Sequence, residues 1–571
     1  MKSKFTTKLL LSALVAMMPF LLMAQSVAPA KNVILMISDG TSLSTVSLAR
    51  WYQRLKDPSQ QKLFVDPYLS GTILTYCSNA PIGDSAPTTS TYMTGVPSIQ
   101  GFVATYPFSD GENDLVPLDP SMEYRPLMTL MQATSILQGR KIGLVMTSEF
   151  SHATPADCVA SSYKRSNYKW IVPQMVHNNI DVVFGGGAML LDHSQVEYLK
   201  KNGYDVFKND LSSLTNYNGK KVWSLFGPMD VAYDLDAKDG TDPRIDEMTA
   251  AAIKALDGSD EGFMLMVEGS KVDWAAHAND PVAMATDFLA FDRAIGVALD
   301  FAKKDGNTVV IVTSDHGNSG LSIGTRRLKN YAGASLTEVF GPLTDIKLTS
   351  VGMERFIQSL DADDIASEFE KNAGFSLTDQ EADVIRILSD LKGKKGEDRQ
   401  VVVDKLRELG ISTEEASRNK GDFSSLSSYI ASLYRKQMGL EFTTGGHTGE
   451  EVFLATYAPT QEQRLMGFNT NLELHEYMRQ LLGLESSMLD LTKEYFAPHS
   501  ELFKGMKYEM KGKDSVDMVL TVKHNKHTLV IKPFTTIVEL DGKEQLLPIS
   551  TVYSPKTEQM YISNSVLELL K

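Results

Sequence analysis

Ser85 has a sequence context that suits a reactive hydroxyl group. It lies two residues before Pro87, which fits the first turn of a helix, and Gly95 fits the cap that would end this helix. Ser85 is therefore predicted at a helix N-terminus, where free backbone amides and the helix dipole favour an alkoxide or a phosphoryl group. Taken alone, Ser85 or Asp84 is more often an ordinary helix cap, because Ser and Asp are common caps.

Carboxylates and histidines occur together at two places with spacing that suits a metal site. Asp273 and His277 are four residues apart, so on a helix they share one face and can reach the same ion. Glu268 lies shortly before them, where an apolar run ends. Asp315 and His316 follow another apolar run and precede glycines that permit a sharp turn. Taken alone, Asp273 and His277 are more often a simple surface pair.

Further candidate residues are scattered along the chain. Asp39 follows the first apolar run, where burying its carboxylate without a cation would be costly. His447 lies in a loop of small residues, residues 443–450, where an imidazole has little to pack against. Arg165 suits bidentate capture of phosphate oxygens. A loop histidine and a single arginine are, by default, solvated surface residues.

The elements that must position these residues follow from the apolar runs. Such runs, separated by long helical stretches, are typical of parallel strands buried on both faces, so we predict a doubly wound, largely parallel α/β sheet flanked by helices. Open sheets of this kind place their sites at the carboxyl ends of the strands, where the candidate residues fall. The predicted strands are Val33–Ile37, Ile142–Met146, Val182–Phe184, Phe263–Val267 and Val309–Val312.

Together these positions resemble the alkaline phosphatase family, over roughly residues 30–320 and 440–485 and in the same order along the chain. The resemblance implies that Ser85 is phosphorylated in turnover and that Arg165 binds the phosphate. It also implies two Zn²⁺ and one Mg²⁺. The expected ligands are Asp273, His277 and His447 for the first zinc, Asp39, Asp315 and His316 for the second zinc, and Asp39, Thr154 and Glu268 for magnesium.

The chain departs from the family pattern at two positions. His152, expected next to the third metal, stands where many bacterial members have Asp, which leaves the identity of that metal open. Trp274 stands where Lys or His is frequent. The expected substrates are small phosphate monoesters, and a homodimer is possible.

Three other functions compete with this one. A phosphodiesterase or nucleotide pyrophosphatase of the same superfamily would use a similar pair of metals, but the third-metal ligands Thr154 and Glu268 favour monoesters. A sulfatase would need an arginine that residues 85–89 lack. The last alternative is a non-catalytic, exported metal- or phosphate-binding protein.

Composition limits the partners and the compartment. The 571 residues hold 56 Lys and Arg against 71 Asp and Glu, a net charge of −15, so nucleic acid is not an expected partner. Residues 1–24 have three lysines and an apolar run, which indicates a cleaved signal peptide, a periplasmic or secreted protein and no stable membrane span after processing. The two cysteines, Cys77 and Cys158, could form one disulfide but cannot provide a thiolate metal site.

The chain beyond the signal peptide divides into three predicted parts. Residues 30–500 form the α/β catalytic domain, which includes a helical insertion at about 345–438. Residues 505–571 form a small β-rich module with strands expected at 516–522, 528–531 and 535–540. Asp541-Gly542 is predicted to turn a hairpin there. Nothing in the sequence assigns a role to the insertion or to the module.

Overall fold

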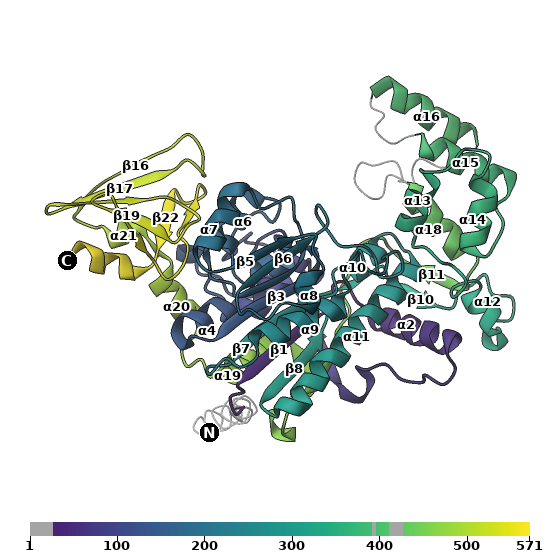
Figure 1. Ribbon diagram of the computed structural model, residues 1–571, viewed down its shortest axis with the longest axis horizontal. Coiled ribbons are helices and arrows are strands. Elements are labelled where there is room, and N and C mark those ends of the chain that lie inside the picture. The colour runs from purple at the N-terminus through teal and green to yellow at the C-terminus, as the bar shows by residue number, and fades with distance from the viewer. Residues whose placement is uncertain (1–26, 391–395, 410–425) are drawn as a thin grey trace, which may run out of the picture.

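The computed structural model describes residues 27–390, 396–409 and 426–571. The predicted signal peptide and part of the predicted insertion lie outside these residues. A ten-stranded sheet crosses the centre of the molecule (Figure 1). In sheet order its strands are β14 (Gly467–Thr470), β2 (Leu69–Leu74), β13 (Val452–Tyr457), β8 (Thr308–Thr313), β1 (Asn32–Ile37), β7 (Phe263–Glu268), β3 (Lys141–Glu149), β4 (Val182–Gly186), β6 (Val222–Phe226) and β5 (Asp205–Lys208).

The sheet confirms the predicted fold class. Every pairing from β8 across to β5 is parallel, as is β14 with β2, and only β13 runs antiparallel to its neighbours. All five predicted strands are present, and they form five adjacent strands of the sheet. β1 is completely buried because helices cover both faces of the sheet, as its uninterrupted apolar sequence predicts.

Alternate residues of β1 point into two separate cores. Val33 and Leu35 belong to one hydrophobic cluster, and Ile34 and Met36 belong to the other. Helices that contribute to the first cluster are α3 (Ser85–Thr94), α4 (Leu130–Gln138), α5 (Ala153–Asp157), α6 (Tyr168–His177), α7 (His193–Lys201), α19 (Asn471–Leu481) and α20 (Met488–Tyr495). Those of the second are α2 (Leu43–Lys56), α9 (Ile245–Leu256), α10 (Lys271–His277) and α11 (Pro281–Asp305), with the short α8 (Ser212–Thr215) packed against it.

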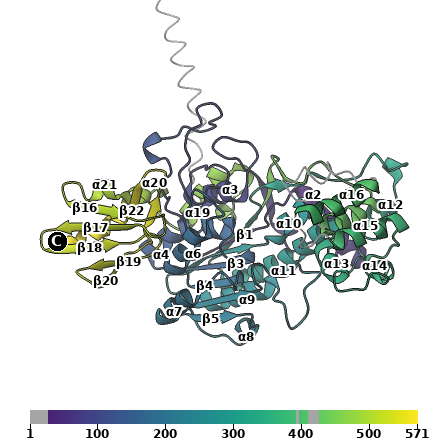
Figure 2. The ribbon, with the colours of Figure 1, turned by 90° about the horizontal axis from the view of Figure 1, so that it is seen from above.

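A helical insertion extends from one end of the molecule (Figures 1 and 2). Its helices begin somewhat before the predicted start, and they share a hydrophobic cluster with residues of α2, α10 and α11. They are α12 (Leu336–Phe340), α13 (Ser350–Ile357), α14 (Ile365–Ala373), α15 (Asp379–Ser389), α16 (Gly396–Glu408) and α18 (Leu426–Lys436). Two short strands flank the insertion in sequence. β10 (Leu321–Ile323) precedes its first helix, β11 (Leu440–Phe442) follows its last helix, and the two strands pair antiparallel.

The C-terminal part is rich in strands and lies at the opposite end (Figure 2). A five-stranded antiparallel sheet holds β16 (Lys507–Lys511), β17 (Val519–His524), β18 (His527–Ile531), β19 (Ile537–Leu540) and β20 (Lys543–Leu546). A second sheet holds β15 (Ala497–Pro498), β22 (Gln559–Ile562) and β21 (Val552–Ser554), and the short α21 (His499–Leu502) follows β15. Asp541 and Gly542 have positive φ angles and turn the hairpin between β19 and β20, as predicted.

The cysteines and the helix lengths bear on two further expectations from the sequence. Cys77 and Cys158 are both free and buried, so the disulfide left open by the sequence is absent. Among the described residues, no helix combines the length and the apolar character that crossing a membrane requires.

Candidate metal centre and nucleophile

Three acidic residues meet at the carboxyl edge of the central sheet. Asp39 follows β1, Glu268 ends β7 and Asp315 follows β8. β1 lies between the other two strands, parallel to both, and its last residue pairs with the last residue of each. The three carboxylates therefore start from adjacent strand ends, and all three side chains are fully buried.

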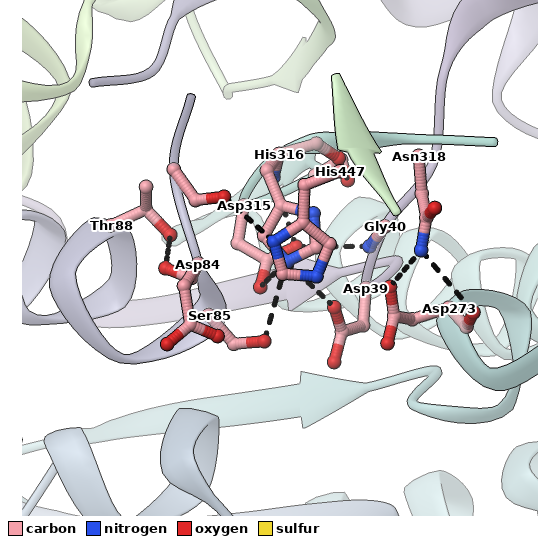
Figure 3. Close-up of polar contacts among 12 residues, drawn as sticks. Asp39, Gly40, Asp84, Ser85, Thr88, Asp273, Asp315, His316, Asn318 and His447 are labelled. Carbon is pink, nitrogen blue, oxygen red and sulfur yellow. Dashed lines mark hydrogen bonds and ion pairs between the residues drawn. The ribbon is translucent and has the colours of Figure 1, made fainter. Parts of the chain in front are cut away.

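Ser85 lies at the first position of α3 and faces this edge (Figure 3). Its Oγ is 3.3 Å from Nε2 of His316, and the residue is only 2% exposed. Pro87 lies in the first turn and Gly95 caps the helix with a φ of 71°, as the sequence predicts. The hydroxyl is therefore held at a helix N-terminus, among side chains predicted to bind metal.

Two short strands bring the distant His447 to the same place. β9 (Gly317–Asn318) pairs with β12 (His447–Thr448), which places His447 opposite Asn318. The rings of His316 and His447 stack with their centroids 3.8 Å apart. His277, at the end of α10, presents its Nε2 3.2 Å from Nε2 of His447 and 3.3 Å from Oδ2 of Asp273.

The three histidines share one hydrogen-bonding arrangement. Each ring donates from Nδ1 to a backbone carbonyl, which leaves the Nε2 lone pair directed toward the carboxylates and the other rings. The acceptors are Gly317 for His316 at 3.1 Å, Gly445 for His277 at 2.8 Å and Gly83 for His447 at 2.8 Å. Metal-binding histidines are held in this way, because the second nitrogen fixes the orientation and tautomer of the ring.

The ligand atoms cluster as a metal site requires. Three groups have potential ligand atoms within 4.8 Å of one another: Asp273, His316 and His447; Asp39, Asp315 and His316; and Asp39, His152 and Glu268. Several buried polar atoms of these residues lack a hydrogen-bond partner among the described residues, namely both carboxylate oxygens of Asp39, Oε1 of Glu268, Oδ2 of Asp315 and Nδ1 of His152. Because buried polar atoms are normally satisfied, their lack of partners favours a site for cations.

The pKa values of the clustered side chains, in the protein without metal, also favour a site for cations. Burial, together with Asp315, raises the pKa of Asp39 well above its usual value and that of Glu268 to about 8. Burial and the neighbouring His316 lower the pKa of His447 to about 4. Closely spaced carboxylates resist ionising together without a cation, and the neutral ring of His447 is in the form that binds metal. At His277 the carboxylate of Asp273 outweighs the effect of burial and raises the pKa to about 9, so this ring must release a proton when it binds a metal. The residues present therefore fit divalent metals of the kind that nitrogen and oxygen ligands hold.

Arg165 lies beside this cluster and is fixed by two partners. It forms an ion pair with the carboxylate of Asp84, and its Nη2 donates to Nε2 of His152 at 3.0 Å. Burial and the guanidinium of Arg165 lower the pKa of His152 to about 3, so this ring is neutral near pH 7. The ring of Trp274 meets that of His152 edge to face, with centroids 6.1 Å apart. Thr154 lies two residues further on, and its Oγ1 is buried without a hydrogen-bond partner among the described residues.

Sequence reasoning missed several residues that hold the site together. Asn318 donates from Nδ2 to Oδ1 of Asp273 at 2.7 Å, and the backbone N–H of Gly40 donates to Oδ1 of Asp315 at 3.0 Å. Lys271 is 2% exposed and forms an ion pair with Asp230. The sequence offered only one signal for these contacts, the position of Asn318 two residues after His316, because each contact joins segments far apart along the chain.

The structure brings together Ser85, Arg165, His152, Asp39, Glu268, Asp273, His277, Asp315, His316 and His447, and Thr154 lies two residues after His152. The site combines an oxygen nucleophile at a helix N-terminus, closely grouped carboxylates and imidazoles that fit divalent cations, and a guanidinium. These groups suit an anionic substrate whose charge must be offset during displacement at phosphorus.

Comparisons with known proteins agree with this geometry. A family model described as "Alkaline phosphatase" matches residues 30–484. Alkaline phosphatase 3 of Bacillus subtilis is 29% identical over 448 residues, which cover 76% of this chain and 85% of the relative. The crystal structure of Thermus thermophilus alkaline phosphatase has a TM-score of 0.66 at 22% identity, covering 82% of this chain and 96% of that one. A cold-active alkaline phosphatase from Shewanella sp. has a TM-score of 0.64 at 22% identity, covering 79% and 99%.

The family match extends over most of the chain, from before β1 to just after α19, and includes every residue predicted for the site. The C-terminal sheets lie beyond it. The chain therefore belongs to the alkaline phosphatase family.

Proposed function

We propose that the protein is an exported phosphomonoesterase that transfers the phosphoryl group of small phosphate monoesters to Ser85 and then to water. One observation carries this proposal: the Ser85 hydroxyl lies at the N-terminus of α3, 3.3 Å from Nε2 of His316 and within the group of buried carboxylates and imidazoles. A serine in this position can act as a nucleophile without a dedicated histidine base, provided that cations stabilise its alkoxide.

The proposal assigns three metals to the donor groups. The first zinc would be held by Asp273, His277 and His447, and the second by Asp39, Asp315 and His316. A magnesium ion would be held by Asp39, Thr154 and Glu268, with His152 beside it. When bound, the zinc ions would lower the pKa of the Ser85 hydroxyl and offset charge on the leaving oxygen.

The residues define the identity of the third metal less closely than that of the two zinc ions, because one of its neighbours is an imidazole. His152 has a ligand atom within 4.8 Å of those of Asp39 and Glu268. Two variants of the alkaline phosphatase from the Antarctic bacterium TAB5, in which a histidine is replaced by aspartate or glutamate, are described with Mg bound in the M3 site. Carboxylate oxygens suit Mg²⁺ better than an imidazole does, so His152 would weaken magnesium binding relative to Asp.

Side-chain and backbone groups of the protein would position the phosphoryl group of the substrate. Arg165, held by Asp84 and His152, would donate to two phosphoryl oxygens. The first backbone N–H groups of α3 have no acceptor within the helix, so they can stabilise charge on Ser85 Oγ and on the bound phosphate. As the serine oxygen forms its bond to phosphorus, the bond to the leaving alcohol breaks. Water then attacks the phosphoserine, and phosphate is released.

The nucleophile is tested by Ser85→Ala. We expect kcat/KM on an aryl phosphate monoester to fall on the order of 10³-fold or more, because the attacking atom is removed. Rapid acid quenching of the unaltered enzyme should trap phosphate on Ser85, as detected by peptide mass spectrometry. A monoester should also react faster than a diester with the same leaving group.

Ser90→Ala is the matched control, since Ser90 lies on the same helix and its buried Oγ has no hydrogen-bond partner among the described residues. It should keep activity close to that of the unaltered enzyme. Retention of turnover by Ser85→Ala, at unchanged metal content, would show that another group is the nucleophile.

A further inference from the structure

A large open pocket lies beside the proposed site, and its lining reaches Asp84, the residue before Ser85. Its volume is about 930 Å³, and its lining includes Asp84, His277 and His447. Cavities on the order of 300–1,000 Å³ hold organic ligands of considerable size, so the space greatly exceeds what a phosphate group needs. Whatever is esterified to the phosphate therefore has room to be bound here.

One wall of this cavity is apolar. Ile82, Ile99, Ala80 and Cys77 line it. Ile99 and Cys77 are almost fully buried, whereas Ile82 is 51% exposed and lies at the rim. Such an exposed isoleucine beside a polar catalytic site loses contact with water when an apolar group packs on it.

The remaining lining carries little charge. Asn79 and Gln100 contribute neutral amides, and none of the described residues around this cavity is a lysine or an arginine. Its only carboxylate is that of Asp84, which is already paired with Arg165. His277 and His447 of the lining are assigned to the first zinc, so an alcohol with a second negative charge would find no lysine or arginine of the lining to pair with, and its desolvation there would not be compensated.

The apolar wall is fixed relative to the site. Ile82 directly precedes Gly83, whose carbonyl accepts the Nδ1 hydrogen bond of His447 at 2.8 Å. The same segment is held by Cys77 N–H donating to the Ala80 carbonyl at 2.9 Å, and by Ser78 N–H donating to the Ser98 carbonyl at 2.8 Å. A group bound to this wall would thus keep a defined position relative to Ser85, three residues after Ile82.

We infer that this cavity binds the alcohol part of the substrate and that it selects uncharged, apolar alcohols over alcohols with a further anionic group. The inference rests on the proposed monoesterase function and adds a substrate class to it. Ile82 is the specificity-determining residue, because it is the most exposed apolar side chain of the wall and lies nearest in sequence to the nucleophile.

A series of n-alkyl phosphates from methyl to hexyl tests the wall. Their alcohols have nearly equal basicity, so differences in kcat/KM report contacts of the chain rather than leaving-group chemistry. Full burial of a methylene would raise kcat/KM roughly 4-fold, and we expect about 2-fold per methylene at this half-open wall. The bisphosphate of 1,6-hexanediol tests charge, and it should react more slowly than hexyl phosphate.

Substitutions at Ile82 should change the ratio between substrates. Ile82→Asn should reduce the hexyl-to-methyl ratio of kcat/KM at least about 3-fold, because the amide offers no apolar contact. Ile82→Lys should raise the bisphosphate-to-hexyl ratio by adding a cation at the rim. Leu546→Asn is the matched control, since Leu546 is 69% exposed on β20 in the C-terminal sheet, and all ratios should stay at their original values.

Binding of hexylphosphonate and methylphosphonate, measured by calorimetry, separates this inference from the proposed function. If no monoester were turned over while hexylphosphonate still bound more tightly, the catalytic proposal would fail and the cavity assignment would stand. Equal affinities of the two phosphonates, a flat alkyl series in an active enzyme, or an unchanged ratio in Ile82→Asn would each overturn the assignment.

Discussion

Gly40 occupies a position that tolerates no side chain. It follows Asp39 after β1, has a φ of +59°, and donates its N–H to Oδ1 of Asp315. A Cβ built at this position would lie 2.2 Å from Oδ1 of Asp273 and 2.9 Å from that residue's Cα. Close approach of the backbone, together with the left-handed conformation, explains why glycine is needed between these carboxylates.

We therefore expect Gly40→Ala to displace Asp273 and to impair metal binding. The content of bound divalent metal after dialysis should fall, and activity should drop by at least about 100-fold, because small displacements within a catalytic site are costly. Gly306→Ala is the control, since Gly306 also has a positive φ of 73° but a Cβ there meets nothing within 4 Å. It should lose about 1–2 kcal/mol of stability, because alanine is strained at a positive φ, and keep its bound metal. Unchanged metal content in Gly40→Ala would contradict this account.

At the scale of secondary structure, the helix that carries Ser85 is supported by a buried histidine on a second helix. His475 of α19 donates from Nδ1 to the carbonyl of Tyr92 in α3 at 3.0 Å. Burial lowers the pKa of His475 to about 4, below the usual value of 6.5. The neutral ring therefore fits this interface and the charged ring does not.

This shift predicts a dependence of stability on pH. Between about pH 4 and 6.5 the unfolded chain binds a proton at His475 that the folded chain does not, so stability falls as the pH falls through this range. His475→Gln keeps an N–H donor for the Tyr92 carbonyl but cannot titrate. We expect its free energy of unfolding, from urea denaturation, to depend on pH with a slope smaller by about one proton. An unchanged slope would show that His475 is not buried in the neutral form.

At the scale of the whole molecule, the C-terminal sheets pack against the main core. Phe534 stacks on Trp170 of α6 with ring centroids 5.5 Å apart, and it belongs to the same hydrophobic cluster as one face of the central sheet. Ser550 N–H donates to Oδ1 of Asn178, just after α6, at 2.9 Å. The predicted boundary of a separate module at residues 505–571 stays a proposal, and these contacts favour a module that unfolds together with the rest.

Phe534→Ala tests whether the two parts are one cooperative unit. The lost burial and stacking should cost about 3–5 kcal/mol and lower one shared Tm, followed both by near-UV circular dichroism and by loss of activity. Leu546→Asn, at an exposed site of the same sheet, should change stability by about 0.5 kcal/mol or less. Two separate transitions, with activity surviving the first, would mean that the module folds independently.

Much of the fold could be predicted from the sequence because its strongest signals are local. The five apolar runs became β1, β3, β4, β7 and β8, since a strand buried on both faces must be apolar throughout. The limits of α3 were also predictable, because Pro87 and Gly95 mark them through backbone geometry alone. Shorter strands were placed less well, as β17 begins at Val519 rather than Val516, because half-exposed strands have a weaker pattern.

The sequence by itself determined which residues have the chemistry: the serine at a helix start, the carboxylates after strands, and the histidines with Arg165. Only the tertiary structure decided which of them meet. His447 reaches His316 through the pairing of β12 with β9, and Asn318 and Gly40 hold Asp273 and Asp315 in place. The cavity beside Ile82 also exists only in the fold. The reason is physical: residue type and local spacing are properties of a short segment, whereas contacts between segments hundreds of residues apart depend on how the whole chain packs.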